Sequence, residues 1–139
     1  MTAADRRLAL LLRFYVGLFA VAGLAYLLLP GETFAIANWV SRQLTPSLPP
    51  IPPSAEKFWL ALSFALLATL AALSFVVQRD VARYRGCVVV IIASKLASTL
   101  VYLALFLLSA RHLAYLMACA TDGILFAVTL ALYRRAEAV

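Results

Sequence analysis

Residues 87–109 read CVVVIIASKLASTLVYLALFLLS, an apolar run in which Lys95 is the only residue that carries a full charge. A helix of roughly 20 mostly apolar residues is long enough to cross the ~30 Å hydrocarbon core of a bilayer. The segment therefore predicts a transmembrane helix with a lysine inside it. Because a charge at that depth is costly unless it is paired, the segment also predicts a polar partner elsewhere in the fold.

Three further segments have the same apolar character: residues 8–29, 58–77 and 112–133. In lipid only helices and closed barrels satisfy every backbone group. A barrel would need segments of about ten residues in which apolar and polar side chains alternate, and the sequence lacks that alternation. We therefore expect an all-α, polytopic membrane protein with four transmembrane helices in an antiparallel bundle.

The composition of the chain supports the same class. Of the 139 residues, 65% are hydrophobic and 13% are charged, whereas a soluble domain has roughly 45–50% apolar and about 25% charged residues. A soluble core of this length could not bury so much apolar surface. The sequence therefore predicts one integral membrane domain that covers residues 1–139.

Basic residues are distributed unevenly around the four segments. One side of the expected membrane has Arg6, Arg7, Arg79, Arg83, Arg85, Arg134 and Arg135. The other side has only Arg42, Lys57 and Arg111. By the positive-inside rule both termini are cytoplasmic and the loop at residues 30–57 is extracytoplasmic, in a cytoplasmic (inner) membrane. This distribution explains the net charge of +6 without a nucleic-acid partner, and the seven arginines are also candidates for contact with anionic lipids.

The first apolar segment has an alternative interpretation as a cleaved signal peptide. Arg6 and Arg7 would be its basic start, and Ala35-Ile36-Ala37 resembles a cleavage site. However, residues 8–29 exceed the usual apolar length of about 7–15 residues in a signal peptide, and Arg13 interrupts them. We expect this segment to be retained as a transmembrane helix.

The loop at residues 30–57 contains two recognisable parts. Residues 33–45 predict a short interfacial helix, with Phe34 and Trp39 as anchors at the lipid headgroups. The apolar face of this helix is expected to consist of Ile36, Ala37, Val40 and Leu44. Residues 46–53, PSLPPIPP, predict an extended polyproline II segment because proline fixes φ and lacks an N–H. This proline-rich segment is either a stiff spacer or a docking strip for a partner.

Residues that commonly carry chemistry are scarce. Cys87 and Cys119 are expected ~20 Å apart in depth, beyond the limit of about 7 Å between the Cα atoms of a disulfide. His112 is the single histidine, and no metal-ligand cluster, phosphate loop or serine-nucleophile motif is present. The sequence therefore predicts no catalytic residue, no metal and no cofactor, and it argues against most membrane enzymes.

Three ionisable residues lie inside the predicted helices: Arg13, Lys95 and Asp122. A rise of ~1.5 Å per residue places Lys95 ~12 Å and Asp122 ~16 Å from the cytoplasmic ends of two consecutive helices, so a salt bridge between them is expected. Gly123 would allow these helices to approach closely. Other polar side chains recur at helical spacing beside the pair, and they complete a predicted buried polar centre. These are Ser94, Ser98, Thr99, Tyr102, Tyr115 and Cys119, and Thr129 continues the polar stripe of the last helix.

Arg13 leaves two alternatives open. Its side chain can extend back to the cytoplasmic interface, or it can turn toward Lys95 and Asp122. In the second case two bases share one carboxylate, and the site either keeps Lys95 uncharged or attracts an anion.

Three classes of function fit these residues. The sequence favours a non-catalytic membrane component or a ligand- or lipid-binding subunit, in which the Lys95–Asp122 pair sets the register of two helices. The alternatives are a proton- or ion-coupled transporter of a small amphiphilic or anionic substrate and a lipid-modifying membrane enzyme. Besides the bilayer, we expect a second copy or a larger assembly as partner, because the second apolar segment has a face of small residues. This face consists of Ala61, Ala65, Ala68 and Ala72.

Overall fold

The computed structural model describes residues 2–52 and 57–137, with the side chain of residue 137 left out of the description. These residues form an all-α structure of five helices: α1 (Ala3–Leu28), α2 (Pro30–Leu44), α3 (Lys57–Val77), α4 (Val81–Leu108) and α5 (Leu113–Glu137). Four of them, α1, α3, α4 and α5, are long and apolar enough to cross a membrane. The predicted all-α class and its four long apolar helices are therefore confirmed.

Two of the long helices begin earlier than their apolar segments. The side chain of Thr2 accepts a hydrogen bond from the Asp5 N–H, and the Asp5 carboxylate accepts one from the Thr2 N–H. This capping box starts α1 at Ala3 instead of residue 8. The Asp80 carboxylate accepts from the Arg83 N–H and starts α4 at Val81 instead of residue 87. The helices extend beyond the predicted apolar spans because apolar composition marks the span, whereas capping side chains mark the end of the helix.

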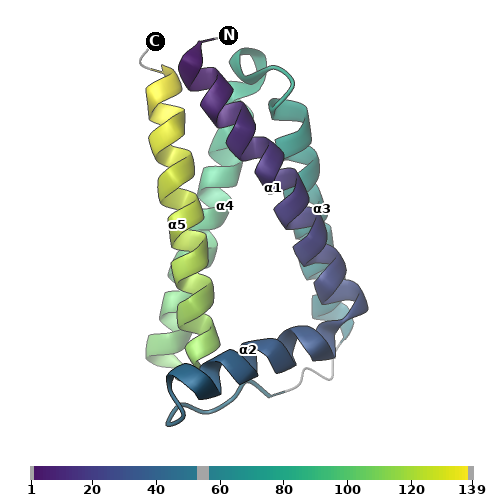
Figure 1. Ribbon diagram of the computed structural model, residues 1–139, viewed down its shortest axis with the longest axis vertical. Coiled ribbons are helices and arrows are strands. Elements are labelled where there is room, and N and C mark those ends of the chain that lie inside the picture. The colour runs from purple at the N-terminus through teal and green to yellow at the C-terminus, as the bar shows by residue number, and fades with distance from the viewer. Residues whose placement is uncertain (1, 53–56, 138–139) are drawn as a thin grey trace.

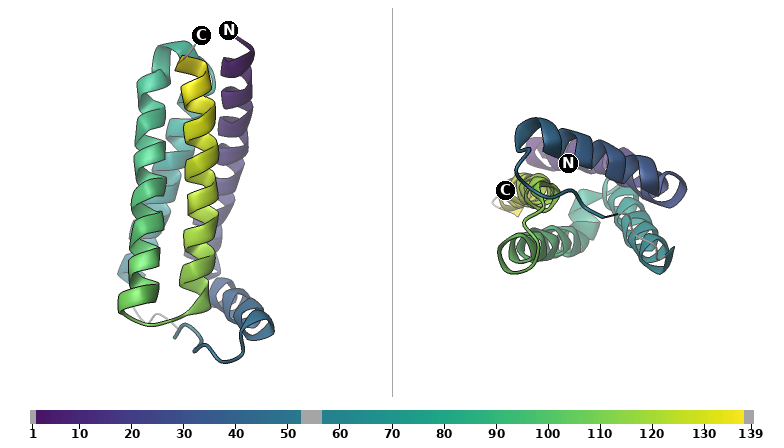
Figure 2. Two further views of the ribbon diagram at one scale, coloured as in Figure 1. Left: turned by 90° about the vertical axis from the view of Figure 1, so that its left-hand side faces the viewer. Right: turned by 90° about the horizontal axis from the view of Figure 1, so that it is seen from below.

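The short helix α2 lies across the ends of the long helices that are remote from the termini (Figures 1 and 2). It begins at Pro30, three residues before the predicted start, because proline is well suited to the first turn of a helix. Of its predicted apolar face, Ile36 and Leu44 are exposed and Ala37 and Val40 are half-buried, whereas Ser41 is buried. Phe34 is half-buried, and its ring lies edge-on to that of Tyr26 of α1.

The four long helices are arranged as two pairs. α1 packs mainly against α3, and α4 packs mainly against α5, with sparser contacts between the pairs. Figure 1 shows the two pairs close together at the end that carries both termini and the α3–α4 turn, and further apart toward α2. α2 contacts both α1 and α5, so it connects the separated ends of the two pairs.

The hydrophobic core is concentrated where the two pairs meet. Its side chains come mainly from the half of each long helix that lies near the termini. They are Leu8, Ala9, Leu12, Tyr15, Phe19, Leu70, Val77, Val81, Val88, Ile91 and Ala136. Elsewhere large apolar side chains are exposed along the long helices, for example Val21, Leu100 and Ile124. This distribution resembles a protein surrounded by hydrocarbon more than one surrounded by water.

The proline-rich segment is attached to the helices at two points. The Asn38 side chain pairs with the main chain of Ile51, and the Nδ1 atom of His112 lies 2.8 Å from the Pro49 carbonyl oxygen. Residues 46–48 form a turn, closed by a hydrogen bond from the Leu48 N–H to the Thr45 carbonyl. The prediction of an extended conformation is therefore wrong for this first part, and Pro53 lies outside the described residues.

Candidate functional site

The ion pair predicted between Lys95 and Asp122 is present and joins α4 to α5. Lys95 Nζ donates to Asp122 Oδ1 at 2.9 Å, and the two side chains are 8% and 15% exposed. The geometry follows from the short connection between α4 and α5, which places two residues of similar depth opposite each other. Gly123 of α5 faces Thr99 of α4, since a Cβ added at Gly123 would lie 3.5 Å from Thr99 Cγ2.

Further contacts surround both members of the pair. Ser98 Oγ donates to Asp122 Oδ2, so both carboxylate oxygens accept hydrogen bonds. Thr99 Oγ1 donates to the Lys95 carbonyl at 2.6 Å. The Lys95 ammonium also lies 4.8 Å from the centroid of the Phe19 ring on α1, within the range of a cation–π interaction. The pair is therefore enclosed by three helices.

The predicted tyrosines form a second layer on the α2 side of the pair. Tyr102 is two helical turns after Lys95, and Tyr115 is two turns before Asp122. Their rings stack with centroids 6.4 Å apart.

Two predicted members of the polar centre remain outside its hydrogen bonds. Ser94 and Cys119 are half-buried. No hydrogen bond joins either of them to Lys95 or Asp122 within residues 2–52 and 57–137. Cys87 and Cys119 are free cysteines, in agreement with their expected separation.

Arg13 does not join the buried polar centre, so of the two alternatives that the sequence left open the structure excludes the inward one. Its side chain is exposed, as is the neighbouring Gly17 on the same face of α1. The reason is helical geometry, because α1 turns Leu12 and Tyr15 into the core and each residue rotates the side chain by ~100°. The site with two bases and one carboxylate therefore does not form.

A second buried polar contact, between Tyr15 and Thr129, connects the two helix pairs. Both side chains are fully buried, and the Tyr15 hydroxyl lies 2.7 Å from Thr129 Oγ1. The Tyr15 hydroxyl also donates to the Leu125 carbonyl at 3.1 Å. Thr129 was expected on the polar stripe, but Tyr15 was missed, although a tyrosine in the middle of an apolar helix is a signal for a buried hydrogen bond.

The arginines near the termini divide into two groups. Arg85 forms an ion pair with Asp5, with Nη2 and Oδ1 3.1 Å apart, and it is half-buried between α1 and α4. The sequence predicted Arg85 only as a contact for anionic lipids, and its ion pair with Asp5 is an additional contact that was not predicted. The other six arginines are exposed, and they are Arg6, Arg7, Arg79, Arg83, Arg134 and Arg135.

Comparison with known proteins identifies no relative: no protein family, curated protein or solved structure matches the chain. Within the described residues, no group of three or more His, Cys, Asp or Glu side chains is arranged to hold a metal ion. The chemistry of the Lys95–Asp122 centre thus follows from its own geometry. Both oxygens of the Asp122 carboxylate accept hydrogen bonds from α4, so the centre joins α4 to α5.

Proposed function

We propose that the chain is an integral membrane protein in which α1, α3, α4 and α5 cross the bilayer as an antiparallel bundle. The exposed apolar side chains along these helices support this arrangement. α2 would lie in the interface at the end remote from the termini, since Ile36 and Trp39 are exposed on one face of it. The positive-inside rule assigns that end to the extracytoplasmic side of an inner membrane.

Within the membrane we propose a non-catalytic role, as a structural component or a ligand- or lipid-binding subunit. The observation that supports this role most directly is the closed set of contacts around Lys95 and Asp122. A transporter that couples to protons needs a carboxylate that can gain and lose a proton during its cycle. Asp122 is instead held by the Lys95 ammonium and the Ser98 hydroxyl group, so both of its carboxylate oxygens are already used in contacts that join α4 to α5.

Exposed surfaces of the bundle support the proposed partners. Ala61, Ala65 and Ala72 are exposed on α3, and small residues of this kind allow close packing of a helix from a second copy or a larger assembly. The six exposed arginines near the termini are placed to contact anionic headgroups of the cytoplasmic leaflet.

A transport assay tests the non-catalytic role. Purified protein in liposomes with an internal pH dye is challenged with a panel of amphiphilic cations and anions. We expect no protein-dependent pH change, because Asp122 stays paired with Lys95.

The matched variants are Asp122→Asn and Glu32→Gln, the second removing an exposed acid from α2. A pH change that is lost in Asp122→Asn and kept in Glu32→Gln would contradict the non-catalytic role and support a proton-coupled transporter.

A further inference from the structure

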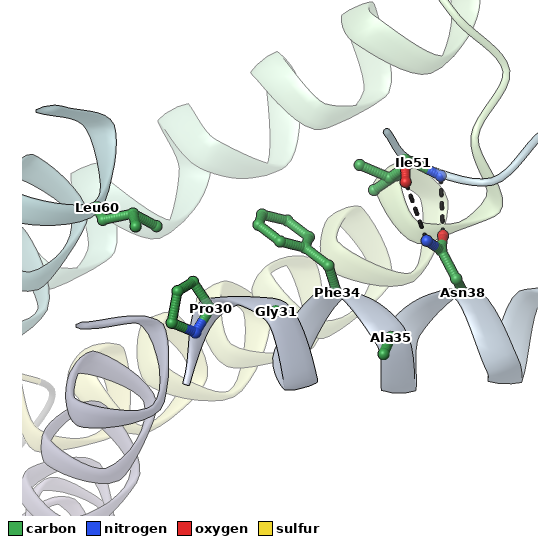
Figure 3. Close-up of a pocket in the computed structure, with 7 residues that line it drawn as sticks. All are labelled: Pro30, Gly31, Phe34, Ala35, Asn38, Ile51 and Leu60. Atoms are coloured by element: carbon green, nitrogen blue, oxygen red, sulfur yellow. Dashed lines mark hydrogen bonds between the residues drawn. The ribbon is translucent and has the colours of Figure 1, made fainter. Parts of the chain in front are cut away.

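A hollow of about 270 Å³ lies between α2 and the start of α3 (Figure 3). One face of α2 forms its long wall with Gly31, Phe34 and Ala35, and Leu60 of α3 lies at the other side. Ile51 of the proline-rich segment lines it next to Asn38. Figure 3 shows the Phe34 ring directed into the space between Leu60 and Ile51.

The polar atoms of the Asn38 side chain are already used. Its Oδ1 accepts from the Ile51 N–H at 2.8 Å, and its Nδ2 donates to the Ile51 carbonyl at 2.9 Å (Figure 3). The other lining side chains are apolar, so the hollow presents mainly hydrocarbon to an occupant. A polar ligand would lose hydrogen bonds to water without replacing them, whereas an aliphatic chain would gain contacts.

The surroundings of the hollow indicate where such a chain comes from. Leu28 and Leu29, just before the α2 wall, are 68% and 57% exposed, and Phe58 and Trp59, just before Leu60, are 69% and 56% exposed. If α1 and α3 cross the membrane, these side chains contact lipid, and the hollow is in reach of lipid tails. Lys57 is exposed three residues before Leu60, on the same face of α3.

We propose that this hollow binds one acyl chain of a membrane phospholipid, with the lipid phosphate paired to Lys57. The acyl chain of the lipid suits the apolar lining of the hollow, and the negative phosphate of its headgroup suits the positive charge of Lys57. Glu32 lies on a neighbouring face of α2 together with Ile36 and Trp39, so it does not line the hollow. The inference rests on the proposed membrane insertion, and it specifies the lipid-binding role.

Gly31 provides a direct way to fill the hollow. A Cβ at Gly31 would meet no atom within 4 Å, and none of the described glycines has a positive φ. Gly31→Phe should therefore occupy the space without displacing the backbone. Gly17 offers a matched control, because it is equally open and lies on the exposed face of α1, away from the hollow.

The experiment measures phospholipid binding in detergent. Delipidated protein is titrated with dioleoyl phosphatidylglycerol and the bound lipid is counted by native mass spectrometry. We expect Gly31→Phe to weaken binding by more than about tenfold, since several methylene groups lose their apolar contacts, and Gly17→Phe to match the unmodified chain. Lys57→Gln should weaken binding by a few-fold, because the phosphate loses an exposed cation.

Equal binding by Gly31→Phe and Gly17→Phe would overturn the proposal. Circular dichroism and gel filtration verify that each variant is folded. If Gly31→Phe does not fold, Ala35→Leu replaces it as a variant that fills the hollow with a smaller side chain. A proton-transport result at Asp122 leaves this test unaffected, because Asp122 is on α5 and the readout is bound lipid. Failure of membrane insertion would be evident separately, as protein that stays soluble without detergent.

Discussion

Lys95 is accommodated in an apolar helix because each of its neighbours compensates part of the cost of burying a charge. Asp122 supplies the opposite charge, and Ser98 donates a hydrogen bond to the second oxygen of the Asp122 carboxylate. The ring of Phe19 lies near the Lys95 ammonium. Removal of one partner would leave the other as an unpaired buried charge. The pair should therefore be strongly coupled, although its net contribution to stability can be small.

This coupling can be measured with a double-mutant cycle. Lys95→Met alone or Asp122→Leu alone should lower the free energy of unfolding by about 3–5 kcal/mol, and the double variant should recover much of the loss. Reversible unfolding in mixed detergent micelles provides the free energies. Arg13→Met is the control, because it removes a charge from an exposed position of α1 and should cause no comparable loss.

Additive losses in the double variant would show that Lys95 and Asp122 do not stabilise each other. Such a result would contradict the ion pair at 2.9 Å and the register that it defines between α4 and α5.

At the scale of helices, the contacts between the two pairs are sparser than those within each pair. Two polar links connect the pairs near the termini. Asp5 of α1 forms an ion pair with Arg85 of α4, and Tyr15 of α1 bonds to Thr129 and the Leu125 carbonyl of α5. Since few apolar contacts join the pairs toward α2, these links should contribute to how α1 docks on its neighbours.

Tyr15→Phe tests the link to α5. The substitution keeps the buried ring and removes only the hydroxyl group, while Thr129 keeps its hydrogen bond to the Leu125 carbonyl. We expect a loss of about 0.5–1.5 kcal/mol in the free energy of unfolding, the usual net value of one hydrogen bond.

Tyr26→Phe is the control on the same helix. Within the described residues, the Tyr26 hydroxyl makes no hydrogen bond, so its removal should have little effect. Equal losses in the two variants would contradict the assignment of the Tyr15 hydroxyl as a link between the pairs.

For the whole molecule, both termini and the α3–α4 turn lie at one end, and α2 lies at the other (Figure 1). This arrangement agrees with the uneven distribution of arginines, six of which are exposed near the termini. Insertion with the termini in the cytoplasm would place the proline-rich segment and α2 outside.

Cysteine labelling checks this orientation. In a chain with Cys87→Ser and Cys119→Ser, we expect Ser47→Cys to react with a membrane-impermeant maleimide in intact cells, because Ser47 is exposed beside α2. Arg7→Cys, near the N-terminus, should react only after permeabilisation. The reverse pattern would overturn the orientation and with it the assignment of the exposed arginines to the cytoplasmic leaflet.

The sequence alone determined the class of the protein, its four long apolar helices and the Lys95–Asp122 ion pair. Apolar length follows from local composition, and the short connection between α4 and α5 leaves little freedom in how two residues of similar depth face each other. A helix in the loop at residues 30–57 was also predictable from its pattern, although its start at Pro30 was not.

Only the tertiary structure decided the outward position of Arg13, the contact of Phe19 with Lys95, the Asp5–Arg85 pair and the hollow beside Gly31. Each of these depends on the rotation of a helix about its own axis and on how one helix pair docks against the other. In an apolar helix most faces are similar in hydrophobicity, so composition does not distinguish the buried face from the exposed one. Side-chain packing between distant segments selects that face.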